Sequence, residues 1–386
     1  MEYASLKDHE DAVDRTSDVI FAVLGFAYLF PFWALVQPVD YWHILFPTFN
    51  VEFDISLTYT VASVLTLVWV VFVSGVRGHN VRIVGGLATQ VAVLVVLPFV
   101  ALVPSPVYRH VMVLTSTVWI AIATAILDSS VFGLAALFPK GAIEHVQFGM
   151  GISGLVTAIF RVVSKACFPA SMLTVATTTY FFAGAVTVGS AIIAYFALLR
   201  LPQTQDHLHA DRTQHSFQCR LLTKVWKNQA LVVLNYATTL AVYPGVVSEL
   251  RSFQSPMLNS NEWWPLLLLT LYAAMEVVGR YGAAWSHCGF TPQSVWRAVV
   301  TRLVLIPALV CAAKGVWLTH DIISVGLVMA LALSNGYVGT LTVVLVNDCV
   351  DPSERSATGM VSSLCINIGL ILGAAVAYFV SQAAHM

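Results

Sequence analysis

Charged side chains are scarce in this sequence. Only 10% of the 386 residues are Asp, Glu, Lys or Arg, and 58% are apolar. A soluble domain typically has about 25% charged residues, so this composition excludes an ordinary soluble fold. The mean hydropathy of +0.80 instead predicts a polytopic membrane protein of the all-α class.

Other features are missing as well. The formal net charge is −1, so there is no basic stripe for binding a nucleic acid polymer. The polar, acidic head at 1–18 is unlike a signal peptide, and we expect none. The six cysteines show no metal-type spacing, and the sequence lacks His-Glu-x-x-His and similar enzyme motifs. We therefore expect no metal, no cofactor and no enzymatic activity.

Eleven apolar segments are long enough to cross about 30 Å of hydrocarbon. They cover residues 18–38, 57–76, 83–103, 110–138, 146–168, 173–200, 226–248, 264–285, 295–314, 320–347 and 356–382. The longest polar connection, 201–225, separates six of these segments from five. We expect two packed helical bundles, residues 1–200 and 226–386, joined by a cytoplasmic linker at 201–225, as in transporters built from repeated bundles.

The distribution of Lys and Arg predicts the orientation. If the N-terminus lies in the cytosol, the cytosolic ends of the segments hold twelve of these residues and the outer ends hold four. An odd number of spans then places the C-terminus outside the cell, and we expect the protein in the plasma membrane.

The segment 266–285 carries an acid and a base near its middle. Glu276 and Arg280 are four residues apart, so they share one face of a helix and can neutralise each other. Charge at the bilayer centre costs at least about 2.5–3.5 kcal/mol. The pair is either a structural ion pair or part of a polar site that faces a water-filled path. We favour the second interpretation, because charged residues within spans usually mark functional sites.

The first segment contains a proline in its interior. Pro31 removes a helical hydrogen bond, and we expect a break in the helix there. Phe32 and Trp33 follow directly. Aromatic rings beside such a break can stack on a planar ligand, or they can be ordinary interfacial residues at a kink. The residues alone leave both interpretations open.

Polar or small residues interrupt several other segments. Asp128 lies deep in an apolar run. Arg161 lies where lipid is expected, so it either pairs with a carboxylate or extends outward. Positions that suit close helix packing or gating occur at Gly149, Ser153, Gly154 and Asn335. A solute pathway explains such buried charges and interior prolines better than a purely structural bundle does.

Five motifs, taken in order along the chain, resemble one family. They are LGFAYLFPFW in the first segment, SSVFGLAALFP with GMGISGLVTAIFRVVSKA in the fourth and fifth, YATTLAVYPGV in the seventh, MEVVGR in the eighth and SNGY in the tenth. Together these motifs resemble the equilibrative nucleoside transporters over essentially the whole chain. The sequence departs from that family at Trp33, Asp128 and Glu276, where Asn, Gln and Asp are usual.

The resemblance implies a fold similar to that of major-facilitator carriers, with a set of residues that bind substrate. It places the base beside the first segment and opposite the acid of the fourth, with the charged pair of the eighth near the sugar or the far edge of the base. Aromatic faces stack on a base, and carboxylate and guanidinium groups hydrogen-bond its edge or the ribose. The expected binding set is Leu29, Phe32, Trp33, Asp128, Tyr243, Glu276 and Arg280.

We therefore expect a carrier of nucleosides or nucleobases, purines among them, that works by alternating access in the lipid bilayer. Transport is either facilitative or coupled to protons, since Asp128 and Glu276 are two acids in a site that excludes water. The alternative is a major-facilitator carrier for another small polar organic solute. Twelve spans with both termini inside would favour that alternative.

Overall fold

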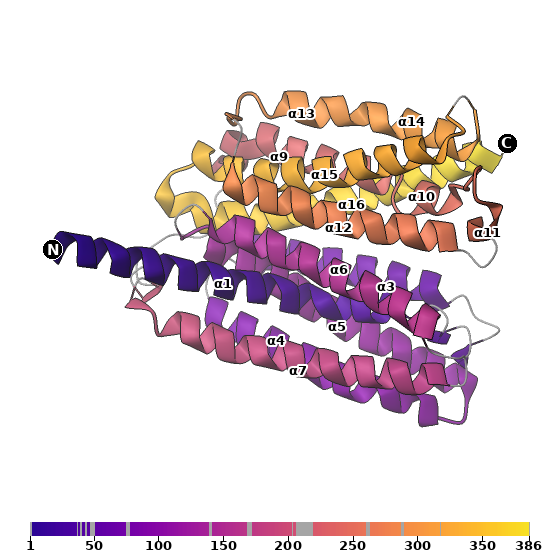
Figure 1. The fold of residues 1–386 in the computed structure, drawn as a ribbon. Coiled ribbons are helices and arrows are strands. Elements are labelled where there is room, and N and C mark those ends of the chain that lie inside the picture. Colours follow the sequence, from indigo (N-terminus) through magenta and orange to yellow (C-terminus); the bar gives the residue numbers. More distant parts are fainter. Residues whose placement is uncertain are drawn as a thin grey trace. The chain divides into compact units, whose positions relative to one another are not determined.

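The computed structural model describes residues 2–36, 38, 41–42, 45–46, 51–74, 78–138, 141–167, 172–202, 204–205, 219–259, 263–286, 289–316 and 318–385. These residues form helices and their connections, with no strand among them (Figure 1). Eleven helical segments within the described residues are long and apolar enough to cross a membrane. The predicted all-α class and number of spans are confirmed.

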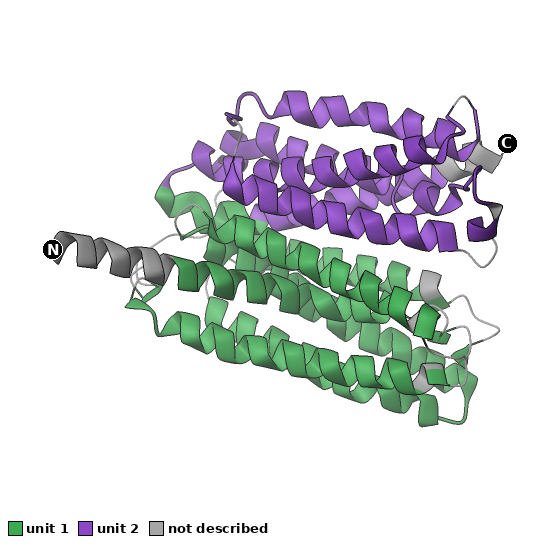
Figure 2. Ribbon diagram, viewed as in Figure 1, with its two compact units in different colours: residues 1–218, 352–360 green, residues 219–351, 361–386 purple. Residues whose placement is uncertain are grey.

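Contacts along the chain divide it into two compact units (Figure 2). Unit 1 is residues 1–218 with 352–360, and unit 2 is residues 219–351 with 361–386. The last helix, α16 (Arg355–His385), therefore begins in unit 1 and continues in unit 2. The expected division into 1–200 and 226–386 stays a prediction. Much of its linker, residues 206–218, lies outside the described residues.

Unit 1 contains the first six spans. Helix α1 packs on α6 and α7, while α5 packs on α3 and α4. A π-helix, η1, continues α3, and a 3-10 helix, η2, continues α4. The bounds are α1 (Glu2–Val36), α3 (Val51–Trp69), η1 (Val70–Ser74), α4 (His79–Val96), η2 (Leu97–Leu102), α5 (Pro106–Ala135), α6 (Ala142–Cys167) and α7 (Leu173–Leu199), with η6 (Pro352–Glu354) before α16.

Unit 2 is organised around α15, which packs on α9, α12 and α14. The ninth span of the chain, which lies in this unit, is divided into α13, a short 3-10 helix η4, and α14. The bounds are α9 (Cys219–Leu240), α10 (Gly245–Glu249), α11 (Pro256–Asn259), α12 (Trp263–Trp285), α13 (Trp296–Thr301), η4 (Arg302–Val304), α14 (Leu305–Ala313), α15 (Asp321–Val346) and η5 (Asn347–Cys349).

Glycines bring certain helix backbones into direct contact. A Cβ atom at Gly149 of α6 would overlap the α1 backbone, and one at Gly336 of α15 would overlap the backbone of Glu276 on α12. Within unit 1, a Cβ atom at Gly359 of α16 would meet the backbone of Phe132 on α5. Small residues allow this approach, which increases van der Waals contact where lipid offers no hydrophobic driving force.

Pro31 lies inside α1, and the helix continues past it to Val36. The expected break at this proline is therefore wrong. Pro31 is buried, and α1 packs on both α6 and α7. Neighbouring helices of this kind allow a transmembrane helix to tolerate the missing hydrogen bond.

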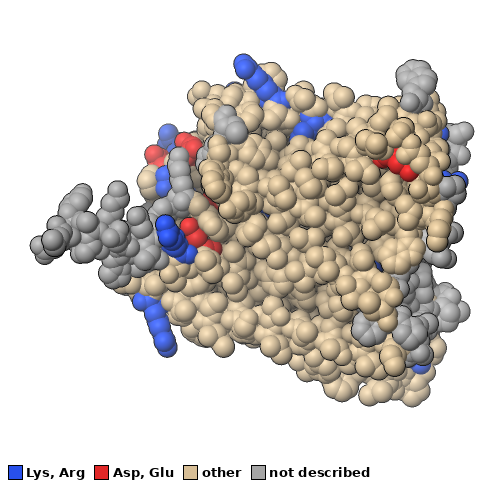
Figure 3. Space-filling view, in the orientation of Figure 1, with Lys and Arg blue, Asp and Glu red and all other residues tan. Residues whose placement is uncertain are grey.

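The outer faces of the helices are apolar. Val81, Val186 and Ile193 each expose more than 70% of their surface, at 79%, 74% and 73%. On the face drawn in Figure 3, uncharged residues cover most of the surface, and only a few Lys, Arg, Asp and Glu side chains appear. Such a surface suits hydrocarbon, which is consistent with an integral membrane protein.

Candidate functional site

In unit 1, a buried aspartate is hydrogen-bonded to a tyrosine. Asp128 of α5 is only 7% exposed. Its Oδ1 accepts a hydrogen bond of 2.9 Å from the hydroxyl of Tyr28 on α1. A buried carboxyl group needs such a partner, because burial without one is costly.

Gln90 of α4 extends this contact to a third helix. Its Nε2 donates to the backbone carbonyl of Tyr28 at 2.8 Å and to the hydroxyl of Thr124 at 3.0 Å. Thr124 lies one turn before Asp128 on α5 and is also buried. We call Tyr28, Gln90, Thr124 and Asp128 the polar cluster of unit 1.

Aromatic rings adjoin this cluster. Phe32 follows Tyr28 by one turn on α1, so both lie on one face of the helix. The Phe32 ring centre is 4.3 Å from that of Tyr59 on α3 and 5.2 Å from that of Trp33. The Tyr59 side chain is also close to that of Thr124. The aromatic group and the polar cluster are therefore continuous, with Phe32 and Trp33 partly exposed.

The expected packing and gating positions of unit 1 lie on α6. The buried Ser153 hydroxyl donates to the carbonyl of Met150 at 3.0 Å. A Cβ atom at Gly154 would lie 3.6 Å from the Trp33 ring, so the first span lies over this glycine. Arg161 is partly exposed and forms no ion pair with a described residue.

In unit 2, the ion pair predicted from the spacing of four residues is present. Arg280 Nη2 lies 2.7 Å from Glu276 Oε1, and the side chains are 8% and 18% exposed respectively. Asn335 of α15 donates from Nδ2 to the same Oε1 at 2.9 Å. Both donors therefore approach one oxygen of the carboxylate.

Arg302 of η4 bonds to the other end of the Asn335 amide. Its Nη2 reaches Asn335 Oδ1 at 3.4 Å and the Thr239 hydroxyl at 2.6 Å. Its Nη1 donates to the carbonyl of Asn235 at 3.0 Å and to Asn235 Oδ1, and its Nε donates to Ser334 at 3.0 Å. We call Asn235, Thr239, Glu276, Arg280, Arg302 and Asn335 the polar network of unit 2.

Stacked tyrosines lie next to this network. The Tyr243 and Tyr272 ring centres are 3.8 Å apart, and their planes differ by 17°. Tyr272 is buried and precedes Glu276 by one turn of α12, so the two share a helix face. Tyr243 is partly exposed. Each unit thus combines aromatic rings with hydrogen-bonding groups.

Sequence reasoning missed part of both groups. In unit 1 it missed Tyr28, although its spacing from Phe32 places both on one face. In unit 2 Arg302, Asn235 and Thr239 were not among the predicted site residues. Asn235 and Thr239 are one turn apart on α9, which is a local signal for a polar face.

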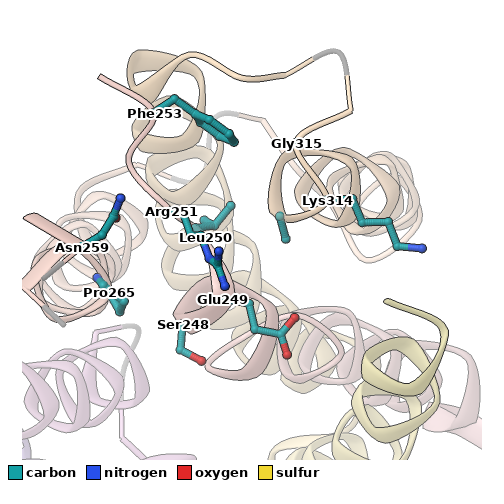
Figure 4. Close-up of a pocket in the computed structure, with 10 residues that line it drawn as sticks. Ser248, Glu249, Leu250, Arg251, Phe253, Asn259, Pro265, Lys314 and Gly315 are labelled. Carbon is teal, nitrogen blue, oxygen red and sulfur yellow. The ribbon is translucent and has the colours of Figure 1, made fainter. Parts of the chain in front are cut away.

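A separate cavity of about 780 Å³ lies at the end of unit 2. Figure 4 shows Glu249 and Arg251 beside it, while the Lys314 side chain extends away from both. None of its lining residues belongs to the polar network. The described residues contain no group of three His, Cys, Asp or Glu side chains placed to hold a metal ion.

A sequence model of the nucleoside transporter family matches residues 114–218 and 201–382. The chain belongs to the nucleoside transporter family. Its members are transporters and not enzymes, as predicted. This family member is 25% identical over 374 residues to equilibrative nucleotide transporter 8 of Arabidopsis thaliana, covering 94% of this chain and 95% of that protein. It is 23% identical over 455 residues to equilibrative nucleoside transporter 4 of Homo sapiens, covering 95% and 83%.

Solved structures with a similar fold include major-facilitator proteins. The proton:xylose symporter XylE, bound to 6-bromo-6-deoxy-D-glucose, superimposes with a TM-score of 0.69 at 11% identity, covering 97% of this chain and 88% of that chain. FucP in the outward conformation gives a TM-score of 0.61 at 13% identity, covering 96% and 98%. The predicted major-facilitator-like fold is thereby confirmed for this family member.

Proposed function

We propose that this protein carries nucleosides across a membrane by alternating access, and that it also accepts nucleobases, purines among them. One observation carries the proposal. In unit 2, Glu276, Arg280 and Asn335 converge beside the stacked Tyr243 and Tyr272. A carboxylate, a guanidinium, an amide and a flat aromatic surface suit a solute that is itself flat and polar.

The chemistry of a nucleoside matches these groups. Its base has a π face for stacking, and its edges and ribose carry donors and acceptors. Glu276 can accept from a ribose hydroxyl or a ring N–H, and Arg280 can donate to carbonyls or ring nitrogens. In a dry site such contacts discriminate strongly, because an unmatched buried polar group is costly. Further contacts with the substrate are proposed for Leu29, Phe32, Trp33, Asp128 and Tyr243.

Coupling to protons is proposed for Asp128. Its carboxyl group is buried and bonded to Tyr28, and acids inside membrane spans commonly take part in proton relays. Proton release and uptake at Asp128 would then accompany reorientation of the carrier.

The proposed location is the plasma membrane, with the N-terminus in the cytosol and the C-terminus outside. The lysine and arginine distribution supports this orientation. Helix packing or gating is proposed for Gly149, Ser153, Gly154, Arg161 and Asn335.

Uptake into transport-deficient cells tests the proposal. The panel contains labelled adenosine, uridine, adenine, uracil, adenosine monophosphate and a hexose. We expect saturable uptake of nucleosides, and loss of that uptake in Arg280→Ala at normal surface abundance. Arg297→Ala is the matched control, because this arginine of α13 is exposed. Uptake of the hexose alone, or unchanged nucleoside uptake by Arg280→Ala, would contradict the proposal.

A further inference from the structure

Arg302 is a buried cation whose donors are all occupied. It is 3% exposed, and its guanidinium makes five hydrogen bonds, to Ser334, Asn235, Thr239 and Asn335. A guanidinium has five N–H donors. No N–H group of Arg302 therefore remains to bind a solute, and its hydrogen bonds instead hold neighbouring protein groups in place.

Every acceptor around Arg302 is neutral. The five bonds end on hydroxyl, amide or backbone oxygens, and Arg302 forms no ion pair with a described residue. A cation buried without a carboxylate is costly. Stability alone is a poor reason to keep a charge at this depth, and charges inside membrane spans commonly serve function.

The two ends of the Asn335 amide are chemically different. Its Oδ1 accepts from the Thr239 hydroxyl at 2.7 Å and from Arg302 at 3.4 Å. An amide oxygen cannot donate, so these contacts orient Asn335 with Nδ2 toward Glu276. The Nδ2 to Oε1 bond of 2.9 Å follows from that orientation.

Glu276 receives both of its donors on one oxygen. Arg280 and Asn335 both approach Oε1, at 2.7 and 2.9 Å. Among the described residues, none donates to Oε2, and the side chain is 18% exposed. Oε2 is therefore an oriented acceptor with unused capacity.

We propose that Arg302 is a positioning residue: together with Thr239 it orients the amide of Asn335, which fixes Glu276 so that Oε2 accepts from a substrate hydroxyl or N–H. This inference rests on the proposed function. It assigns Arg302 an effect on substrate affinity without any contact with substrate.

Two hydroxyls that bond Arg302 provide a matched pair for the test. Thr239 bonds both Arg302 and Asn335, whereas Ser334 bonds Arg302 and the carbonyl of Leu331. Thr239→Val and Ser334→Ala each remove from the arginine one hydrogen bond to a neutral hydroxyl group. A purely structural role of Arg302 would make the two variants similar in both stability and transport.

The experiment measures initial rates of uridine uptake against concentration, with surface abundance and thermal stability of each variant. We expect Thr239→Val to raise KM by about fivefold, as for loss of the one buried hydrogen bond that orients the Asn335 amide, with little change in Vmax. Ser334→Ala should stay within about twofold of the wild type, which is less than half of the free energy of one such bond. In a Glu276→Gln background, adding Thr239→Val should change KM no further, because both act through one carboxylate.

Equal KM values for Thr239→Val and Ser334→Ala, or independent effects of Thr239→Val and Glu276→Gln, would overturn the positioning role while leaving nucleoside transport intact. Absence of uptake of both uridine and adenosine by the wild type would instead overturn the proposed function, and this inference with it. Arg302→Lys provides a further check. It keeps the charge but loses the planar fork, so KM should rise as in Thr239→Val.

Discussion

Tyr28 and Asp128 meet through a 2.9 Å hydrogen bond that joins α1 to α5. The phenol is a neutral donor, so it stabilises the carboxyl group without cancelling a charge there. The two residues can therefore be separated by mutation. Tyr28→Phe removes the donor and keeps the acid, while Asp128→Asn removes the acid and keeps a hydrogen-bonding side chain.

The first prediction uses this pair to test proton coupling. If Asp128 carries a proton, wild-type uptake should be faster at mildly acidic than at neutral external pH, and a protonophore should prevent accumulation above equilibrium. Asp128→Asn should retain binding but lose the pH dependence, because the amide cannot titrate. Tyr28→Phe should retain it. Wild-type uptake that is flat with pH and insensitive to a protonophore would leave a passive carrier.

The second prediction concerns stacking at Phe32. Its ring lies 4.3 Å from that of Tyr59 beside the polar cluster of unit 1. Stacking on a base is worth about 1–3 kcal/mol, so Phe32→Ala should raise the KM for nucleosides by about fivefold or more. Phe99→Ala is the control, since Phe99 is 52% exposed on η2. An unchanged KM in Phe32→Ala at normal abundance would place this ring in packing instead.

The third prediction concerns the contact between α12 and α15. A Cβ atom at Gly336 would overlap the Glu276 backbone, whereas one at Gly326 of the same helix has nothing within 4 Å. Gly336→Ala should destabilise the protein by about 1–3 kcal/mol through overpacking. Gly326→Ala should be neutral or stabilising by up to about 1 kcal/mol, through helix propensity. Apparent melting temperatures in detergent measure both, and equal values would contradict the contact.

The fourth prediction concerns orientation. Epitope tags at the two termini should respond differently in unpermeabilised cells, with only the C-terminal tag stained. The asymmetry of lysine and arginine is the physical basis. Staining of both tags, or of neither until the cells are permeabilised, would mean that the termini share one side of the membrane.

The number of spans could be predicted from the sequence because each span is a continuous apolar run. In lipid the backbone N–H and C=O groups of such a run must hydrogen-bond to each other, and a helix achieves this. The Glu276–Arg280 pair was predictable for a similar reason, since a spacing of four is local geometry. Pro31 shows that the local effect of a residue on its own helix does not always decide the structure. Its missing hydrogen bond predicts a break, but helix packing around it overrides that preference.

The polar network of unit 2 was less accessible to sequence reasoning. Arg302 meets acceptors from α9 and α15, and hydrophobic periodicity does not say which helices face each other. The sequence shows two acids within spans, Glu276 and Asp128, but not the partners that orient them. The roles of the expected binding residues stay predictions, because a side chain that binds substrate and one that packs in the bundle show the same sequence pattern.

The passage of α16 from unit 1 into unit 2 has a consequence for protein engineering. Residues 352–360 belong with unit 1, where Gly359 lies against Phe132 and the side chain of Met360 lies near Gly133. If the polypeptide is cut between residues 205 and 219, the N-terminal fragment lacks residues 352–360. The surface of α5 around Phe132 and Gly133 then loses its contacts with α16. Split-protein designs should therefore supply residues 352–360 to the N-terminal fragment, or co-express both fragments from the start.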